Sequence, residues 1–93
     1  MKSYEQIPEK SYNVGDVFFW FDETGKINKI YDRIRGKDYT TDNEIFPEIL
    51  KAAAEKLDIF QIRELKARIT ERQYKKICDD VLVAKIEKEL AAH

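Results

Sequence analysis

The chain has 93 residues, the length of one domain, and its 17 basic and 18 acidic residues leave a net charge of −1. The near-zero charge excludes the whole-protein positive field that attracts nucleic acid. No apolar run reaches the ~20 residues of a membrane span, and the polar N-terminus lacks the apolar core of a signal peptide. Because Cys78 is the single cysteine, no internal disulfide is expected, and we expect a cytoplasmic protein.

The first predicted element is a β-hairpin over residues 14–35, preceded by a loose arm over residues 1–13 that Tyr12 partly orders. The run Phe18-Phe19-Trp20-Phe21 is aromatic throughout, which suits a pleated strand. The following DETGK segment has a late glycine, as hairpin loops commonly do. We therefore expect a loop over residues 23–25, closed by Asp22 opposite Lys26.

Regular pairing from this loop places Phe21 opposite Ile27, Phe19 opposite Lys29 and Val17 opposite Tyr31. One face then carries Val17, Phe19, Phe21, Ile27 and Tyr31, edged by Lys29 and Arg33. The other carries Phe18, Trp20, Ile30 and Ile34, edged by Asn28 and Asp32. We expect the helices to cover the second face, which is the more apolar, and to leave the first exposed. A slip of one residue would exchange these sets on one strand.

The second half of the chain predicts three helices, after a third short strand near residues 37–41. The first helix spans residues 42–57 and starts either at a capping box of Thr41 and Glu44 or at Phe46, with Pro47 in its first position. The second spans residues 58–69, and the third residues 70–92. Two capping-box spacings, Asp58 with Gln61 and Thr70 with Gln73, place a break between them. The expected fold is one α+β domain over residues 1–93: a β-hairpin or three-stranded meander followed by three α-helices.

The third helix has two apolar sides at 100° per residue. The first contains Tyr74, Ile77, Cys78, Val81 and Leu82. The second contains Val83, Ile86 and Leu90 and lies on the opposite side. A helix needs one apolar side to join a core, so the second side is available for self-association as a homodimer.

A local resemblance covers residues 62–77, around the sequence IRELKARITERQYKKI. Its shared positions are Leu65, Ile69, Thr70, Glu71, Tyr74 and Ile77. The segment resembles the XkdX-like small proteins of phages and prophages and the SHOCT type of short helical module. Both patterns usually carry a glycine before the Ile-Thr step, where this chain has Arg68. The resemblance implies a phage or mobile-element origin and supplies no catalytic residue.

The inventory of chemical groups predicts a protein that is not an enzyme and uses no cofactor or metal. The single histidine, His93, is the last residue, and Cys78 lies on the core side of its helix. A zinc site would need several Cys or His ligands, and a phosphate loop would need clustered glycines. Neither pattern occurs in this sequence.

Two kinds of partner remain. We predict contact with another protein, or with a second copy, through Phe19, Phe21, Tyr31 and Arg33 on the hairpin and through Val83, Ile86 and Leu90. A phage accessory role as a regulator or inhibitor would fit this small size. The alternative is nucleic-acid binding by the basic residues of segment 63–76, together with the basic and aromatic hairpin face. Those basic residues are Arg63, Lys66, Arg72, Lys75 and Lys76.

Overall fold

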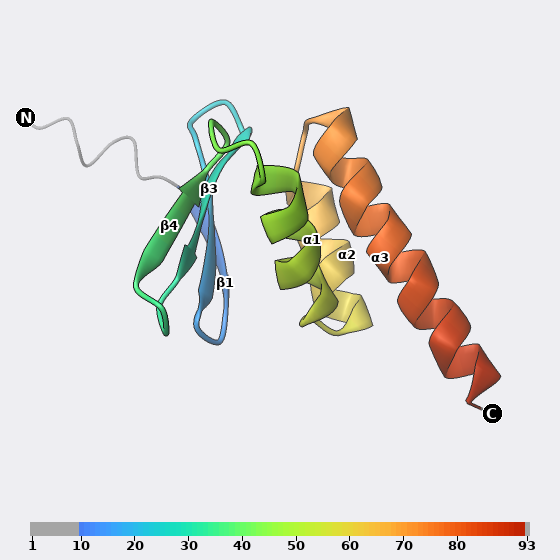
Figure 1. Ribbon diagram of the computed structural model, residues 1–93. Helices are drawn as coiled ribbons and strands as arrows, with labels where there is room; N and C mark the ends of the chain where they lie inside the picture. Colours follow the sequence, from blue (N-terminus) through green and yellow to red (C-terminus); the bar gives the residue numbers. More distant parts are fainter. Residues whose placement is uncertain (1–9, 93) are drawn as a thin grey trace, which may run out of the picture.

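A computed structural model describes residues 10–92 of the chain. Four strands form an antiparallel meander in the order β1-β2-β3-β4, and three helices follow on one side of the sheet (Figure 1). The strands are β1 (Lys10–Val14), β2 (Val17–Phe21), β3 (Ile27–Asp32) and β4 (Lys37–Thr40). The helices are α1 (Phe46–Glu55), α2 (Ile59–Arg68) and α3 (Arg72–Ala91), and α3 lies farthest from the sheet. The predicted α+β class is confirmed, with four strands in place of two or three.

The additional strand is β1, so the prediction of a loose arm is wrong for residues 10–13; residues 1–9 lie outside the described residues. Strand β1 pairs along all of β2, from Lys10 opposite Phe21 to Val14 opposite Val17. Tyr12 packs its ring 6.3 Å from that of Phe19, and its hydroxyl donates a hydrogen bond to Glu64 Oε1 at 3.1 Å. Partial burial, and then this bond, raise the pKa of Tyr12. Tyr12 thereby joins β1 to α2.

The turn between β2 and β3 forms as predicted. Asp22 N donates to Lys26 O at 2.8 Å, and the Asp22 carboxylate accepts from the backbone N–H groups of Thr24 and Lys26. Its hydrogen bonds, first that from the Thr24 hydroxyl, lower the pKa of Asp22. Gly25 has a φ of 90°, which explains the glycine at this position.

The predicted register fails directly after this turn, because β3 contains a bulge. Phe21 does pair with Ile27, but Trp20 pairs with Lys29, so Asn28 is an extra residue without a partner on β2. From there Phe19 lies opposite Ile30 and Phe18 opposite Tyr31. The side chains of β3 beyond the bulge therefore lie on the face opposite to the predicted one.

The bulge reverses the prediction of which sheet face is buried. Phe19 is fully buried and Phe21 is 3% exposed, and both join Ile27 and Ile30 in the hydrophobic core beneath the helices. Phe18 and Trp20, which were expected there, are half-buried on the opposite face. Ile34, also expected there, lies beyond β3 and is 78% exposed. The physical reason is that the bulge brings Ile30 to the same face as Ile27, which is the face of Phe19 and Phe21.

The helix boundaries follow local signals with one exception. Helix α1 begins at Phe46 with Pro47 in its first turn, and the predicted Asp58–Gln61 capping box at the start of α2 is confirmed, with bonds of 2.8 and 2.9 Å. The predicted Thr70–Gln73 capping box does not form at the start of α3, where no side chain caps the helix. The N-cap residue of helix α3 is Glu71, one residue later than predicted.

The α2–α3 corner is instead fixed to the sheet. The Glu71 carboxylate accepts a hydrogen bond from the backbone N–H of Ile27 at 3.2 Å, and the Thr70 hydroxyl donates to Gly25 O at 3.4 Å. Thr70, which was predicted to cap α3, and the neighbouring Glu71 thus hold the β2–β3 turn. This contact connects the inner sheet face to the helices at one end of the core.

The core lies between the inner sheet face and the three helices. Phe46 of α1 packs edge-on against Tyr74 of α3, with ring centroids 5.3 Å apart. The largest fully buried side chains are Phe19, Ile30, Phe46, Leu50, Ile62, Leu65, Ile69 and Cys78. Within residues 10–92, none of the helices is long and apolar enough to cross a membrane.

Candidate protein-binding surfaces

The outer sheet face, defined by Phe18, Trp20, Lys29 and Tyr31, is the most distinctive surface of the molecule. Its three aromatic side chains come from the two central strands, and all are half-buried outside the core cluster. Phe18 and Tyr31 pack across the strands with ring centroids 5.9 Å apart. Among the described residues, no helix covers this face, since all three lie on the other side (Figure 1).

The charges on this outer sheet face nearly cancel. Lys29 Nζ lies 5.7 Å from the centroid of the Trp20 ring, a cation–π geometry. Asp38 of β4 pairs with Tyr31 in the sheet and adds one negative charge on the same side. Thr40, which pairs with Lys29, is exposed at the edge of the face. An aromatic centre with a mixed polar edge is typical of a protein contact surface.

The sequence contained a signal for this face that regular pairing overlooked. Ile27 and Ile30 are three residues apart, and a regular strand cannot place both on one side. An inserted residue reconciles them and turns Lys29 outward. Of the predicted hairpin site, Tyr31 lies on the outer sheet face, whereas Phe19 and Phe21 are in the core.

Arg33, the fourth predicted hairpin residue, lies at the end of the sheet. Its guanidinium Nη2 and Nε contact Asp16 Oδ1 at 2.6 and 3.0 Å, and its backbone N–H donates to Asp16 O at 2.8 Å. These bonds fasten the β1–β2 turn to the end of β3. The structure therefore gives Arg33 a local partner and separates it from Phe19 and Phe21.

A second apolar surface, the α3 stripe, consists of Val83, Ile86 and Leu90. These side chains are 46%, 38% and 71% exposed. They lie on the half of α3 that follows its core residues Cys78, Val81 and Leu82. The structure thus leaves exposed the three residues that were predicted for self-association.

The basic residues predicted for nucleic acid gather in part between α2 and α3. Lys66, Arg72, Lys75 and Lys76 line a cleft of about 350 Å³ together with Asp79. Lys66 Nζ contacts Asp79 Oδ1 at 2.8 Å, which lowers the pKa of Asp79, and Lys76 Nζ lies 3.5 Å from Asp80 Oδ1. Arg63 is exposed on α2 and is not among the residues lining the cleft.

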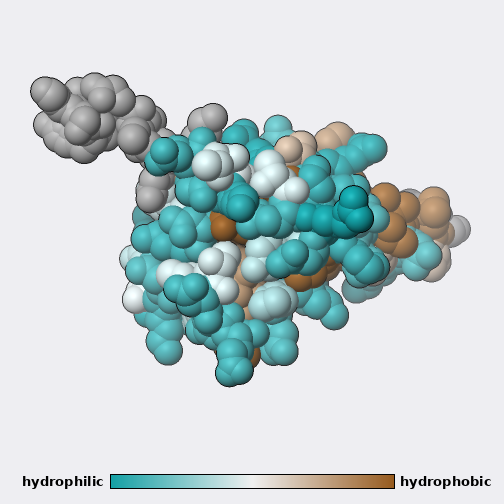
Figure 2. Space-filling model, turned by 90° about the horizontal axis from the view of Figure 1, so that it is seen from above, coloured by the Kyte–Doolittle hydropathy of each residue, from teal (hydrophilic) through white to brown (hydrophobic). Residues whose placement is uncertain are grey.

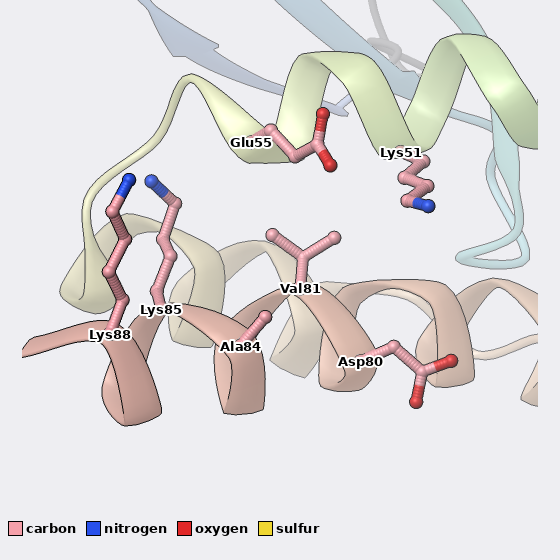
Figure 3. A pocket seen from close by; sticks show the side chains of 7 residues that line it. All are labelled: Lys51, Glu55, Asp80, Val81, Ala84, Lys85 and Lys88. Carbon is pink, nitrogen blue, oxygen red and sulfur yellow. The ribbon is translucent and has the colours of Figure 1, made fainter. Parts of the chain in front are cut away.

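A groove of about 420 Å³ separates α1 from α3 (Figure 3). Lys51 and Glu55 line it from α1, and Asp80, Val81, Ala84, Lys85 and Lys88 line it from α3. The ammonium groups of Lys85 and Lys88 point across the groove toward α1. Basic and acidic side chains are mixed here, so the groove lacks a single charge that would select a small ligand.

Searches of protein-family models, curated proteins and solved structures find no match to this chain. Within residues 10–92, no group of three or more His, Cys, Asp or Glu side chains is arranged to hold a metal ion. Cys78 is buried, and desolvation raises the pKa of its thiol to about 11. A thiol with this pKa is protonated at neutral pH and is a poor nucleophile.

Proposed function

We propose that this protein is a non-catalytic binding protein whose outer sheet face receives a partner protein. The observation that carries the proposal is the position of Phe18, Trp20 and Tyr31 on the sheet face that no described helix covers. Aromatic residues are enriched in the centres of protein interfaces, and Trp and Tyr are common among residues that dominate binding energy.

The size of the face supports a reversible contact. Five-residue strands and the spacing of four strands give an area ~17 Å long and ~15 Å wide. This is smaller than the ~800 Å² that each partner buries in a standard interface. The partner would place apolar side chains on the aromatic centre and polar groups around Lys29 and Asp38. A phage or mobile-element accessory role, as a regulator or inhibitor of this partner, is the part of the proposal that rests on the Ile69-Thr70 resemblance.

Photo-crosslinking tests the proposal. Benzoylphenylalanine replaces Tyr31 in one variant and Ile34, an exposed residue of the β3–β4 turn, in a control variant. In extracts of the native host, the Tyr31 variant should give a discrete protein adduct that the Ile34 variant lacks. The purified partner should then bind the Trp20→Ala variant at least ~30-fold more weakly than the unmodified protein. Adducts shared by both positions, or unchanged affinity of the Trp20→Ala variant, would overturn the proposal.

Nucleic-acid binding is the second candidate, and the basic cleft between α2 and α3 is the observation that favours it. Arg72 and Lys75 line this cleft, and neither takes part in an ion pair among the described residues. Titration with labelled single- and double-stranded DNA and RNA at low salt tests this candidate. Binding through phosphates should weaken steeply as salt rises, and Arg72→Ala should reduce that dependence. Absence of binding at low salt would rule out the nucleic-acid-binding candidate.

A further inference from the structure

The α3 stripe has the spacing of a helix–helix contact. Asp79, Val83, Ile86 and Leu90 follow one another at intervals of four, three and four residues, which is the a/d repeat of two helices packed side by side. The last three positions are apolar and exposed. One side of the second half of α3 therefore presents a continuous apolar seam of about two turns.

The remainder of the described molecule leaves this seam open. Helix α3 has 20 residues, whereas α1 and α2 have 10 each; its buried residues end at Leu82, and its C-terminal end projects past the other two helices (Figure 1). Figure 2 shows hydrophobic atoms gathered at the end of the molecule that carries the C-terminus. The seam and the outer sheet face are therefore separate, since α3 is the helix farthest from the sheet.

Two acidic residues flank the apolar part of the seam. In the heptad numbering, Glu87 occupies the flank on one side of Ile86 and Leu90, and Glu89 occupies the flank on the other. The lysines of this half, Lys85 and Lys88, instead point toward α1 across the groove (Figure 3). The second half of the helix thus places lysines toward α1 and glutamates beside the seam.

We infer that the α3 stripe binds an amphipathic helix of a partner protein whose apolar seam is flanked by lysine or arginine. Basic flanks would pair with Glu87 and Glu89 while apolar side chains cover Ile86 and Leu90. A second copy of this chain fits less well. In an antiparallel pair of α3 helices, the flank that carries Glu87 would meet the same acidic flank of the second copy.

Two designed peptides of three heptads test this inference. Both carry leucine at a and d, one carries lysine at e and g, and the other carries glutamate there. Several charge pairs of ordinary surface strength amount together to about tenfold in affinity, so the lysine peptide should bind at least that much more tightly. Fluorescence anisotropy of the labelled peptides measures both affinities. Equal binding of the two peptides, or binding of neither, would overturn the inference.

Variants of the protein locate the binding. Ile86→Ser combined with Leu90→Ser should abolish binding of the lysine peptide, and the control Ile34→Ser should leave it unchanged. Glu87→Lys combined with Glu89→Lys should reverse the preference toward the glutamate peptide. Trp20→Ala should bind the lysine peptide normally, so this result is independent of the outer sheet face. A concentration-dependent dimer in sedimentation velocity that Leu90→Ser abolishes would instead assign the stripe to a second copy and overturn the inference.

Discussion

The two faces of the sheet differ although one aromatic strand supplies both. Phe19 and Phe21 point inward and are buried, whereas Phe18 and Trp20 alternate with them and are half-buried on the outer sheet face. The strand β2 alone does not distinguish the two sides, because each has two large aromatic rings. The neighbouring strand decides, since β3 adds Ile27 and Ile30 to one face and Lys29 and Tyr31 to the other. The comparison shows that the bulge, by placing Ile27 and Ile30 on one face, makes Phe19 and Phe21 the aromatic pair that joins the core.

The largest difference between the faces should appear in stability. Phe19→Ala should lower the free energy of unfolding by about 3–5 kcal/mol, because it leaves a cavity in a fully buried site. Phe18→Ala, the matched change on the outer sheet face, should lose about 1 kcal/mol, chiefly the packing with Tyr31. Urea denaturation followed by circular dichroism measures both. Equal losses would show that the two faces are buried alike and would contradict the structure.

The next effect concerns the contact between the inner face and the helices. Glu71→Ala removes the acceptor of the Ile27 N–H and should lower the free energy of unfolding by about 1–3 kcal/mol, because a partly buried donor is left unpaired. Glu23→Ala changes an exposed glutamate in the same turn and is the control. A loss no greater than that of the control would mean that the α2–α3 corner does not hold the β2–β3 turn.

A smaller stability effect should distinguish Tyr31. Tyr31→Ala should cost about 1 kcal/mol or less of unfolding free energy, since only the ring contact with Phe18 is lost. The same change should weaken partner binding by more than about tenfold. Calorimetric titration and urea denaturation of one variant compare the two quantities. A large loss of stability without loss of affinity would assign Tyr31 to the fold.

The smallest effect on stability is expected from the titration of Cys78, which lies on the buried side of α3. Burial raises the pKa of its thiol from 9.0 to about 11, so the folded state binds the proton more tightly than the unfolded state. This contribution to stability is complete below pH 9 and is lost as pH rises toward 11. At neutral pH the native thiol should react with a disulfide reagent only through unfolding. An Ile34→Cys variant with Cys78→Ala should react at once, and equal rates would contradict the burial of Cys78.

Much of the fold was predictable because its signals are local. The Asp22 turn, the Asp58–Gln61 box and the break after Arg68 each depend on a few neighbouring residues. The same locality explains the prediction of three helices and of the α3 stripe, whose residues repeat at helical spacing. Strand β1 was missed because its Lys-Ser-Tyr-Asn-Val sequence is mostly polar, and its pairing with β2 and the Tyr12–Glu64 bond involve distant partners.

The candidate site was predicted with the wrong face because one extra residue changes every later side chain of a strand. Asn28 is that residue, and a propensity scale offers no reason to expect a bulge there. Whether Ile30 shares a face with Phe18 and Trp20 or with Phe19 and Phe21 depends on both strands and the helices together. Tyr31 was placed on the exposed face correctly, but its neighbours there are Phe18 and Trp20 in place of Phe19 and Phe21.

Acrylamide quenching of Trp20 fluorescence tests the exposure of the outer sheet face most directly, because Trp20 is the single tryptophan. The structure predicts that the native protein is quenched at a substantial fraction of the rate seen in urea, with emission typical of a partly exposed indole. Phe19→Tyr, placed in the core, should not increase this quenching unless the fold is lost. Native quenching near zero with strongly blue-shifted emission would show that Trp20 is buried and would contradict the proposed binding face.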